Sequence, residues 1–159
     1  MRLNEFLGIK YPFIQGGMAN IATGKFAAAA SEAGALGIIA CGGLKNGEEL
    51  REQIRIARSP TDKPFGVNVM LMSPAAGEQA QVAAEEKVAV VTTGGGSPGR
   101  YISLWKEAGV KVIPVVSAAV IARRLVQEGA DAVIAEGLED AEHPNYSPPD
   151  DFGRGEYYI

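Results

Sequence analysis

Short apolar runs alternate with amphipathic stretches along most of this 159-residue chain, and no other feature constrains its fold as strongly. Most of the runs are near-continuous series of Val, Ile, Leu and Ala without polar alternation. This pattern indicates strands that are buried on both faces, as in parallel sheets. The runs cover Tyr11–Gln15, Leu36–Cys41, Phe65–Leu71, Val88–Thr93, Lys111–Val116 and Asp131–Glu136.

The amphipathic stretches between these runs predict helices at Thr23–Ala33, Gly47–Ala57, Ala75–Glu85, Pro98–Ala108 and Ala118–Gln127. Glycines at 34, 109 and 129 follow three of them, where a helix commonly ends. A strand–helix unit that repeats about every 25 residues predicts a parallel sheet with right-handed crossovers. Two α/β architectures fit, a (β/α)8 barrel and an open doubly wound sheet. In both, the chemistry gathers at the carboxyl ends of the strands.

Composition and charge argue against several classes of partner. A formal net charge of −4 argues against a nucleic-acid partner, which usually requires a basic stripe. No apolar run approaches the roughly 20 residues of a membrane span, and the first residues lack the core of a signal peptide. Cys41 is the only cysteine, so an internal disulfide is excluded and we expect a cytoplasmic protein. One histidine and one cysteine do not make a zinc site.

Two of the predicted strands end in residues suited to a ligand. Gln15–Asn20 reads "QGGMAN", in which paired glycines let backbone amides approach a ligand and Met18 offers a soft apolar surface. A tight turn between strand and helix accounts for the same residues. Asn68 lies within the otherwise apolar run Phe65–Leu71, where an unpaired amide costs about 1–3 kcal/mol. Its partner is either a polar heterocycle or the neighbouring backbone.

A glycine-rich stretch follows Thr93. Gly94, Gly96 and Gly99 match the spacing G-x-G-x-x-G of dinucleotide-binding loops. The next strand does not end in the acidic residue that such sites place on the ribose. We therefore favour a glycine-rich loop of a barrel, and the absence of Gly-Lys-Ser/Thr excludes a nucleoside-triphosphate loop.

The last run ends at Glu136, and the only histidine of the chain, His143, follows seven residues later. A carboxylate and an imidazole near one ligand can perform acid–base work, although a lone histidine in a polar stretch is also typical of a solvated surface. Beyond Glu136 the sequence loses its periodicity and becomes rich in proline and acidic residues. We therefore predict an irregular, disordered tail over 140–159 after a structured domain over 1–139.

Taken together, six motifs resemble one family of flavin-dependent barrels. They are "YPFIQGGMA", "AGALGIIACGG", "TDKPFGVNVML", "KVAVVTTGGGSP", "AGVKVIPVV" and "GADAVIAEG", in the same order. The family comprises the FMN-type enoyl-acyl-carrier-protein reductases and the similar nitronate monooxygenases (2-nitropropane dioxygenases). The resemblance covers roughly residues 5–139 and implies a TIM-type (β/α)8 barrel, here truncated to about six strands.

The resemblance also implies FMN at the carboxyl-terminal mouth of the barrel. Gly17 and Met18 would lie along the flavin, Asn68 would hydrogen-bond it, and Thr93, Gly94 and Glu136 would line the site. In the reductases, NADH or NADPH reduces the flavin, which passes hydride to a 2-enoyl thioester, including one carried by acyl carrier protein. The nitronate enzymes use a histidine base and oxygen. "TDKPFGVNVML" and "GADAVIAEG" are closest to the reductases, with nitronate monooxygenase as the alternative.

The chain departs from the family after Glu136. The family continues Ala-Glu-Gly-x-Glu-Ala-Gly-Gly-His-x-Gly, and His143 keeps this spacing while Ala141 and Glu142 replace the two glycines. "AEHPNY" also resembles a downstream Ala-His-Pro-x-Tyr stretch, so His143 aligns with either of two histidines, the catalytic one in the first alignment. The last two strands with their phosphate-binding loops have no counterpart. Unpaired sheet edges then favour pairing into a homodimer. The missing phosphate-binding loops favour an inactive fragment or an interaction module as the alternative to an enzyme.

Overall fold

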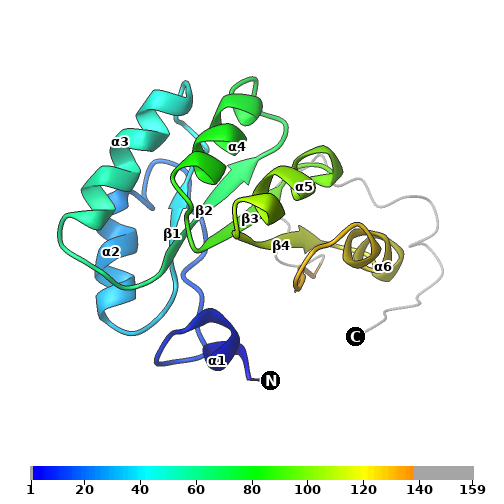
Figure 1. Ribbon diagram of the computed structural model, residues 1–159, viewed down its shortest axis with the longest axis horizontal. Coiled ribbons are helices and arrows are strands. Elements are labelled where there is room, and N and C mark those ends of the chain that lie inside the picture. Colours follow the sequence, from blue (N-terminus) through cyan, green and yellow to red (C-terminus); the bar gives the residue numbers. More distant parts are fainter. Residues whose placement is uncertain (1, 138–159) are drawn as a thin grey trace.

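The computed structural model describes residues 2–137, and its elements alternate as the sequence predicts (Figure 1). Its strands form one parallel sheet in the order β1-β2-β3-β4-β5, so each strand pairs with the one before it in the chain. The predicted parallel α/β class, a partial TIM-type barrel, is confirmed. The elements are α1 (Leu3–Leu7), α2 (Gly24–Glu32), β1 (Gly37–Ala40), α3 (Gly47–Arg58), β2 (Phe65–Met70), α4 (Ala76–Glu85), β3 (Val90–Gly94), α5 (Gly99–Glu107), β4 (Lys111–Val116), α6 (Ala119–Gln127) and β5 (Ile134–Ala135).

Two of the predicted strands are reduced to one or two residues, and one helix was not predicted. The run Tyr11–Gln15 contributes only an isolated bridge between Ile14 and Leu36. Its pairing ends there because the side chain of Gln15, rather than its backbone, accepts the amide of Ile38 at 3.0 Å. The last run keeps only the two residues of β5. Helix α1 spans five residues, which is too short for a helical period to show in the sequence.

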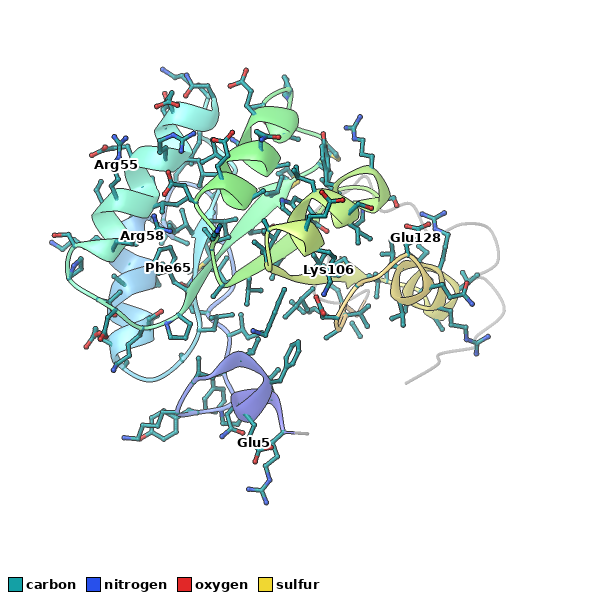
Figure 2. The ribbon with its side chains drawn as sticks, viewed as in Figure 1. Glu5, Arg55, Arg58, Phe65, Lys106 and Glu128 are labelled. Carbon is teal, nitrogen blue, oxygen red and sulfur yellow. The ribbon has the colours of Figure 1, made fainter. Side chains whose placement is uncertain are left out.

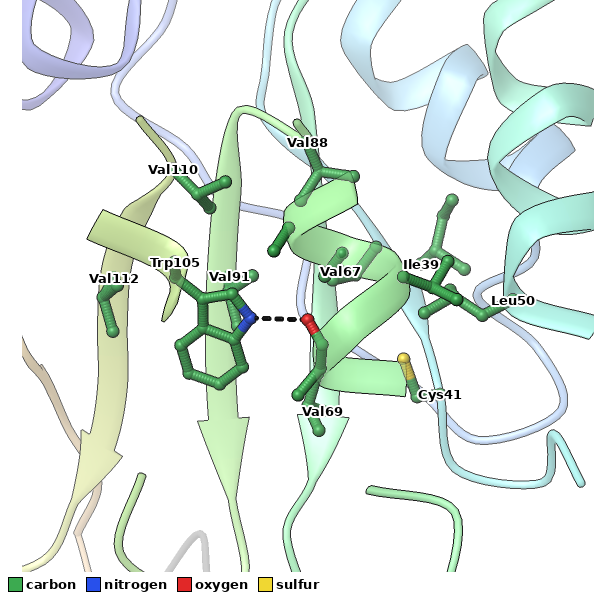
Figure 3. Close-up of a cluster of buried hydrophobic side chains, with 14 of the residues drawn as sticks. Ile39, Cys41, Leu50, Val67, Val69, Val88, Val91, Trp105, Val110 and Val112 are labelled. Carbon is green, nitrogen blue, oxygen red and sulfur yellow. Dashed lines mark hydrogen bonds between the residues drawn. The ribbon is translucent and has the colours of Figure 1, made fainter. Parts of the chain in front are cut away.

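The outward face of the sheet packs against the helices that follow one another around it, α2 to α6 (Figure 1). Its centre is Trp105 of α5, which is fully buried and donates its indole N–H to the carbonyl of Ala80 at 2.9 Å (Figure 3). Val67, Val91 and Val112 lie beside it in the same cluster. Full burial of large side chains makes this layer the main stabilising core.

The inward face of the sheet carries a second, smaller core near the amino-terminal ends of the strands. It consists of Leu7, Leu36, Ile38, Val90 and Ile113, all buried. Leu7 comes from α1, which lies apart from the other helices at one end of the molecule (Figure 1). The inward face is therefore packed at its amino-terminal end, and the side chains nearer the carboxyl ends differ in character.

Five of the helices end with the same backbone reversal, which Gly8 makes after α1 with φ 70°. After α2, α5 and α6 the predicted glycines at 34, 109 and 129 adopt positive φ angles of 100°, 78° and 111°. The amide two residues beyond the C-cap then bonds back into the last turn, as Val110 does to Trp105 at 2.9 Å. After α4 the equivalent position is Lys87, with φ 47°. A side chain in this left-handed region costs about 1–2 kcal/mol.

Charged side chains join neighbouring helices on the outside of the molecule. Figure 2 shows Arg55 and Arg58 along α3 and Lys106 on α5. Arg58 and Arg51 both contact the carboxylate of Glu86 at the end of α4, and Arg51 also reaches Glu85 at 2.6 Å. Hydrogen bonds from Arg51 lower the pKa of Glu85. Burial acts to raise the pKa of Glu86, but the bonds from Arg51 and Arg58 outweigh it and the pKa is lowered.

Candidate functional site

Two polar side chains, Asn68 and Thr92, lie side by side on the inward face near the carboxyl ends of the strands, and we call them the polar row. Ala40, Asn68 and Thr92 occupy paired positions on β1, β2 and β3. Because paired residues of parallel strands point to the same face, their side chains lie on one side of the sheet. It is the face opposite to that of Val67 and Val69, which belong to the outer core. The predicted Asn68 therefore projects into the interior, as a ligand-binding residue of a barrel would.

Gly17 and Asn68 are brought into direct contact. A Cβ atom placed on Gly17 would lie 2.8 Å from both Cβ and Nδ2 of Asn68, so only glycine fits there without displacing the amide. Within the described residues, the buried Oδ1 of Asn68 has no hydrogen-bond partner. An unsatisfied buried acceptor costs about 1–3 kcal/mol, and such a group beside a glycine loop is what a polar ligand would satisfy.

The two adjacent threonines of β3 point in opposite directions. Thr93 pairs with Val69 and lies on the helix-facing side, fully buried, with no partner for Oγ1 among the described residues. The side chain of the predicted Thr93 therefore points away from the site, and only its backbone can contribute to it. Thr92 shares the face of Asn68 instead and was not predicted from the sequence. A near-continuous apolar run gives no alternation from which this choice could be read.

Gly94 lies on the inward face at the end of β3, paired with Met70. A Cβ atom on Gly94 would meet no heavy atom within 4 Å, so the space in front of it is open. The following Gly95 turns back with φ 68°, and a Cβ atom there would lie 2.8 Å from the sulfur of Met70 and 2.9 Å from Cγ of Met72. The strand end thus combines open space before Gly94 with two flexible thioether side chains beside Gly95, neither of which was predicted from the sequence.

The other predicted residues lie around the same end of the sheet. Met18 is 39% exposed, and its carbonyl accepts the amides of Ile21 and Ala22, which turns the chain into α2. Glu136 is half-buried, and its amide donates to the carbonyl of Val116 at 3.0 Å. It follows Ile134 by two residues, so in an extended chain it lies on the inward face. His143 lies outside the described residues.

Cys41 follows β1 at this end of the sheet, but its side chain is fully buried in the outer core. Burial raises the pKa of its thiol, so Cys41 stays protonated and is unsuited to act as a nucleophile. Within residues 2–137, no group of three or more His, Cys, Asp or Glu side chains is placed to hold a metal ion.

The described surface is hollowed at both ends of the sheet. A small hollow of about 70 Å³ lies beside the end of β1 and is bordered by Asn20, Ala40 and Gly42. A larger groove of about 440 Å³ lies at the opposite end of the sheet, where Arg58, Lys63 and Lys87 border it. Because the polar row and the glycine loops lie at the carboxyl ends, we place the site there and not in the larger groove. None of the helices in the described part has the length and apolar character that a membrane crossing requires.

Comparison with known proteins identifies the lineage of the chain. The nitronate monooxygenase family model matches residues 1–155. A carboxyl-CoA dehydrogenase of Mycobacterium tuberculosis, named for a 5-hydroxy-7a-methyl-1-oxo-octahydro-1H-indene-4-carboxyl-CoA, is 37% identical over 141 residues, which cover 89% of this chain and 39% of that protein. A nitronate monooxygenase of Paraburkholderia phytofirmans is 30% identical over an alignment of 189 positions, gaps included, which covers 94% of this chain and 51% of that protein.

Among solved structures, FabK from Thermotoga maritima superposes with a TM-score of 0.84 at 51% identity, over 87% of this chain and 44% of that one. The chain thus spans about half the length, or less, of the proteins that it matches. The family match extends over all of the described residues, and so includes the polar row and the glycine loops beside it. The chain therefore belongs to the nitronate monooxygenase family.

Proposed function

We propose that the carboxyl ends of β1 to β5 form part of an FMN site in an oxidoreductase that acts on 2-enoyl thioesters, with NADH or NADPH as co-substrate. The observation that carries this proposal is the contact between Gly17 and Asn68, whose Oδ1 lacks a partner among the described residues. A planar polar heterocycle would supply that partner. The open space before Gly94 gives room for it at the same end of the sheet.

The residues present fit a flavin in their chemistry. A bound flavin supplies hydride transfer, which the side chains of this chain cannot perform. Asn68 would fix the polar edge of the ring, and Gly17 would let the ring approach the backbone. Gly94 and the backbone of Thr93 would line the space beside it, with Met18 as an apolar surface. Glu136, from the end of β5, would add an acceptor at the rim.

Thioesters are favoured over nitronates as the substrate class. The relatives named nitronate monooxygenase are about 30% identical, whereas the carboxyl-CoA dehydrogenase is 37% identical and FabK is 51% identical. The name of the dehydrogenase states a CoA thioester. The motifs "TDKPFGVNVML" and "GADAVIAEG" support the same branch. We propose that the acyl group is carried by coenzyme A or by acyl carrier protein.

Flavin retention tests the cofactor assignment. The purified chain is mixed with FMN and desalted, and its visible spectrum and flavin fluorescence are recorded. We expect retained flavin in the wild type and in Asn4→Ala, a control in α1, and its loss in Asn68→Ala. Bleaching by NADH without oxygen, with recovery on addition of crotonyl-CoA, would support the reductase. A wild-type chain that retains no flavin contradicts the proposal.

Nitronate oxidation is the second candidate function, since the family model that matches the chain carries that name. Oxygen uptake with an alkyl nitronate, without a response to crotonyl-CoA, would favour it. His143 is the proposed catalytic base in this case. His143→Ala should then abolish turnover while flavin stays bound, and unchanged turnover would refute the role. Flavin binding without any turnover would favour an interaction module.

A further inference from the structure

A buried glutamine on α4 lies next to the candidate site without belonging to its polar row. Gln79 is fully buried between α4 and the sheet, where its neighbours Ala76, Ala80 and Ala83 are apolar. Its Nε2 donates to the carbonyls of Cys41 at 3.4 Å and Leu44 at 3.2 Å. Its Oε1 has no partner within the described residues. An apolar side chain of the same shape would pack here without that cost, so the two donated bonds need an explanation.

Both carbonyls belong to the turn that leaves β1. The amide of Leu44 donates to the carbonyl of Cys41 at 3.0 Å, which closes the turn, and the amide of Cys41 donates to the carbonyl of Asn68 at 3.0 Å. Gly43, inside the turn, has φ 95°. The side-chain amide of Gln79 therefore bonds to both ends of this turn. The turn is itself hydrogen-bonded to the backbone of Asn68 on β2.

This turn supports the loop that carries Gly17. A Cβ atom on Gly43 would collide with the side-chain oxygen of Asn20, and one on Gly42 would touch Ala19 at 3.4 Å. Asn20 itself has φ 62°, a left-handed conformation that asparagine tolerates better than most residues. The two loops thus lie against each other, and at Gly43 there is no room for a side chain.

We infer that Gln79 is a positioning residue, which holds the turn Cys41–Leu44 and, through it, the loop 16–20 at the edge of the site. The route runs from the amide of Gln79 to the turn, from Gly43 to Asn20, and from Gly17 to Asn68. This inference rests on the proposed function for its consequence, flavin binding, but its structural claim does not depend on a bound flavin.

Gln79→Met tests the inference, since methionine keeps the length of the side chain and removes both donors. Gln81→Met is the matched control, because Gln81 lies on the same helix, is exposed and bonds only to Glu85 among the described residues. Hydrogen exchange of two backbone amides reports on the two loops. The amide of Leu44 donates to Cys41 within the turn, and the amide of Ala22 donates to Met18 at the end of the loop 16–20. We expect both amides to exchange roughly tenfold faster in Gln79→Met, without a matching change in the amides of β2 and β3.

Affinity for FMN is the second measurement, and it should fall roughly tenfold in Gln79→Met and stay unchanged in Gln81→Met. Unchanged exchange at Leu44 or Ala22 would overturn the inference. Faster amide exchange over the whole sheet would also overturn it, because it indicates a structural role alone. Unchanged FMN affinity in a Gln79→Met variant whose loop amides exchange faster would overturn it too. If the wild type binds no FMN, the proposed function fails, and the exchange of the two amides still decides the role of Gln79.

Discussion

The two faces of the sheet differ in how their side chains are packed near the carboxyl ends of the strands. On the outward face, Val67, Val91 and Trp105 are fully buried, and the only polar atom of Trp105 is hydrogen-bonded (Figure 3). On the inward face, Asn68 keeps an acceptor without a partner among the described residues, and Gly94 faces open space. Buried polar atoms without a partner among the described residues occur on both faces, Thr93 Oγ1 and Gln79 Oε1 on the outward side and Asn68 Oδ1 on the inward side. Only the inward one lies beside a glycine loop at the carboxyl ends of the strands, so dense packing and ligand binding are separated across the thickness of a single sheet.

Substitution of Trp105 should have the largest effect, on the outward face. Trp105→Ala removes a fully buried side chain and its hydrogen bond to Ala80, so we expect the free energy of unfolding to fall by about 3–5 kcal/mol. Urea denaturation followed by circular dichroism measures this loss. Trp105→Phe, which keeps most of the packing, should lose less. A change below about 1 kcal/mol in Trp105→Ala would show that the outward face is not the main core.

Gly17→Ala should separate binding from stability on the inward face. The added methyl group collides with Asn68, whereas the same change at Gly16 meets no heavy atom within 4 Å. We therefore expect the affinity for FMN to fall on the order of tenfold in Gly17→Ala and little in Gly16→Ala, measured by fluorescence titration. Equal affinities in the two variants would mean that Asn68 does not contact the ligand.

Substitution of Lys87 tests whether its left-handed backbone lowers the stability of the helix layer. Lys87→Gly relieves a left-handed side chain at φ 47° and should raise the free energy of unfolding by about 0.5–1 kcal/mol. Gly109→Ala is the reverse change at the equivalent position after α5, where φ is 78° and a Cβ atom meets nothing within 4 Å. It should lower stability by about 1 kcal/mol. Thermal unfolding compares both, and effects of the same sign would contradict the backbone explanation.

The smallest expected effect is on how the free energy of unfolding depends on pH. The pKa of Glu86 is lowered in the folded chain from its ordinary value of 4.5, so the unfolded chain takes up this proton first as the pH falls. The stabilising contribution is complete above about pH 4.5 and is lost as the pH falls through the folded pKa. Glu86→Gln should therefore reduce the loss of stability between pH 7 and pH 3 by no more than about 1 kcal/mol. An unchanged pH dependence in urea titrations would show that the contacts with Arg51 and Arg58 contribute nothing.

Most elements of this fold could be predicted because the apolar periodicity marks them and local signals mark some of the helix ends. The predicted stretch Gly47–Ala57 differs from α3 by one residue, and the glycines at 109 and 129 adopt the expected left-handed angles. The short α1 and the single bridge at Ile14 were beyond such signals. Their placement depends on tertiary contacts, of Leu7 with the inward core and of the Gln15 side chain with Ile38.

The site was less predictable than the fold. Gly17 and Asn68 carry visible signals, a paired glycine and an amide in an apolar run, and the structure brings them together. The face of each β3 residue carries no such signal, so the choice between Thr92 and Thr93 needed the strand register. The role of Gln79 depends on carbonyls 35 and 38 residues away, which no local pattern contains.

The order of the strands has a consequence for synthesis. Every ladder of the sheet joins a strand to the one made just before it. Each pairing closes a single strand–helix–strand segment, so it loses less chain entropy than a pairing between strands further apart in the chain would lose. A nascent chain that has emerged as far as β3 already holds both partners of its first two ladders, so the ribosome delivers this sheet in the order in which it can be assembled.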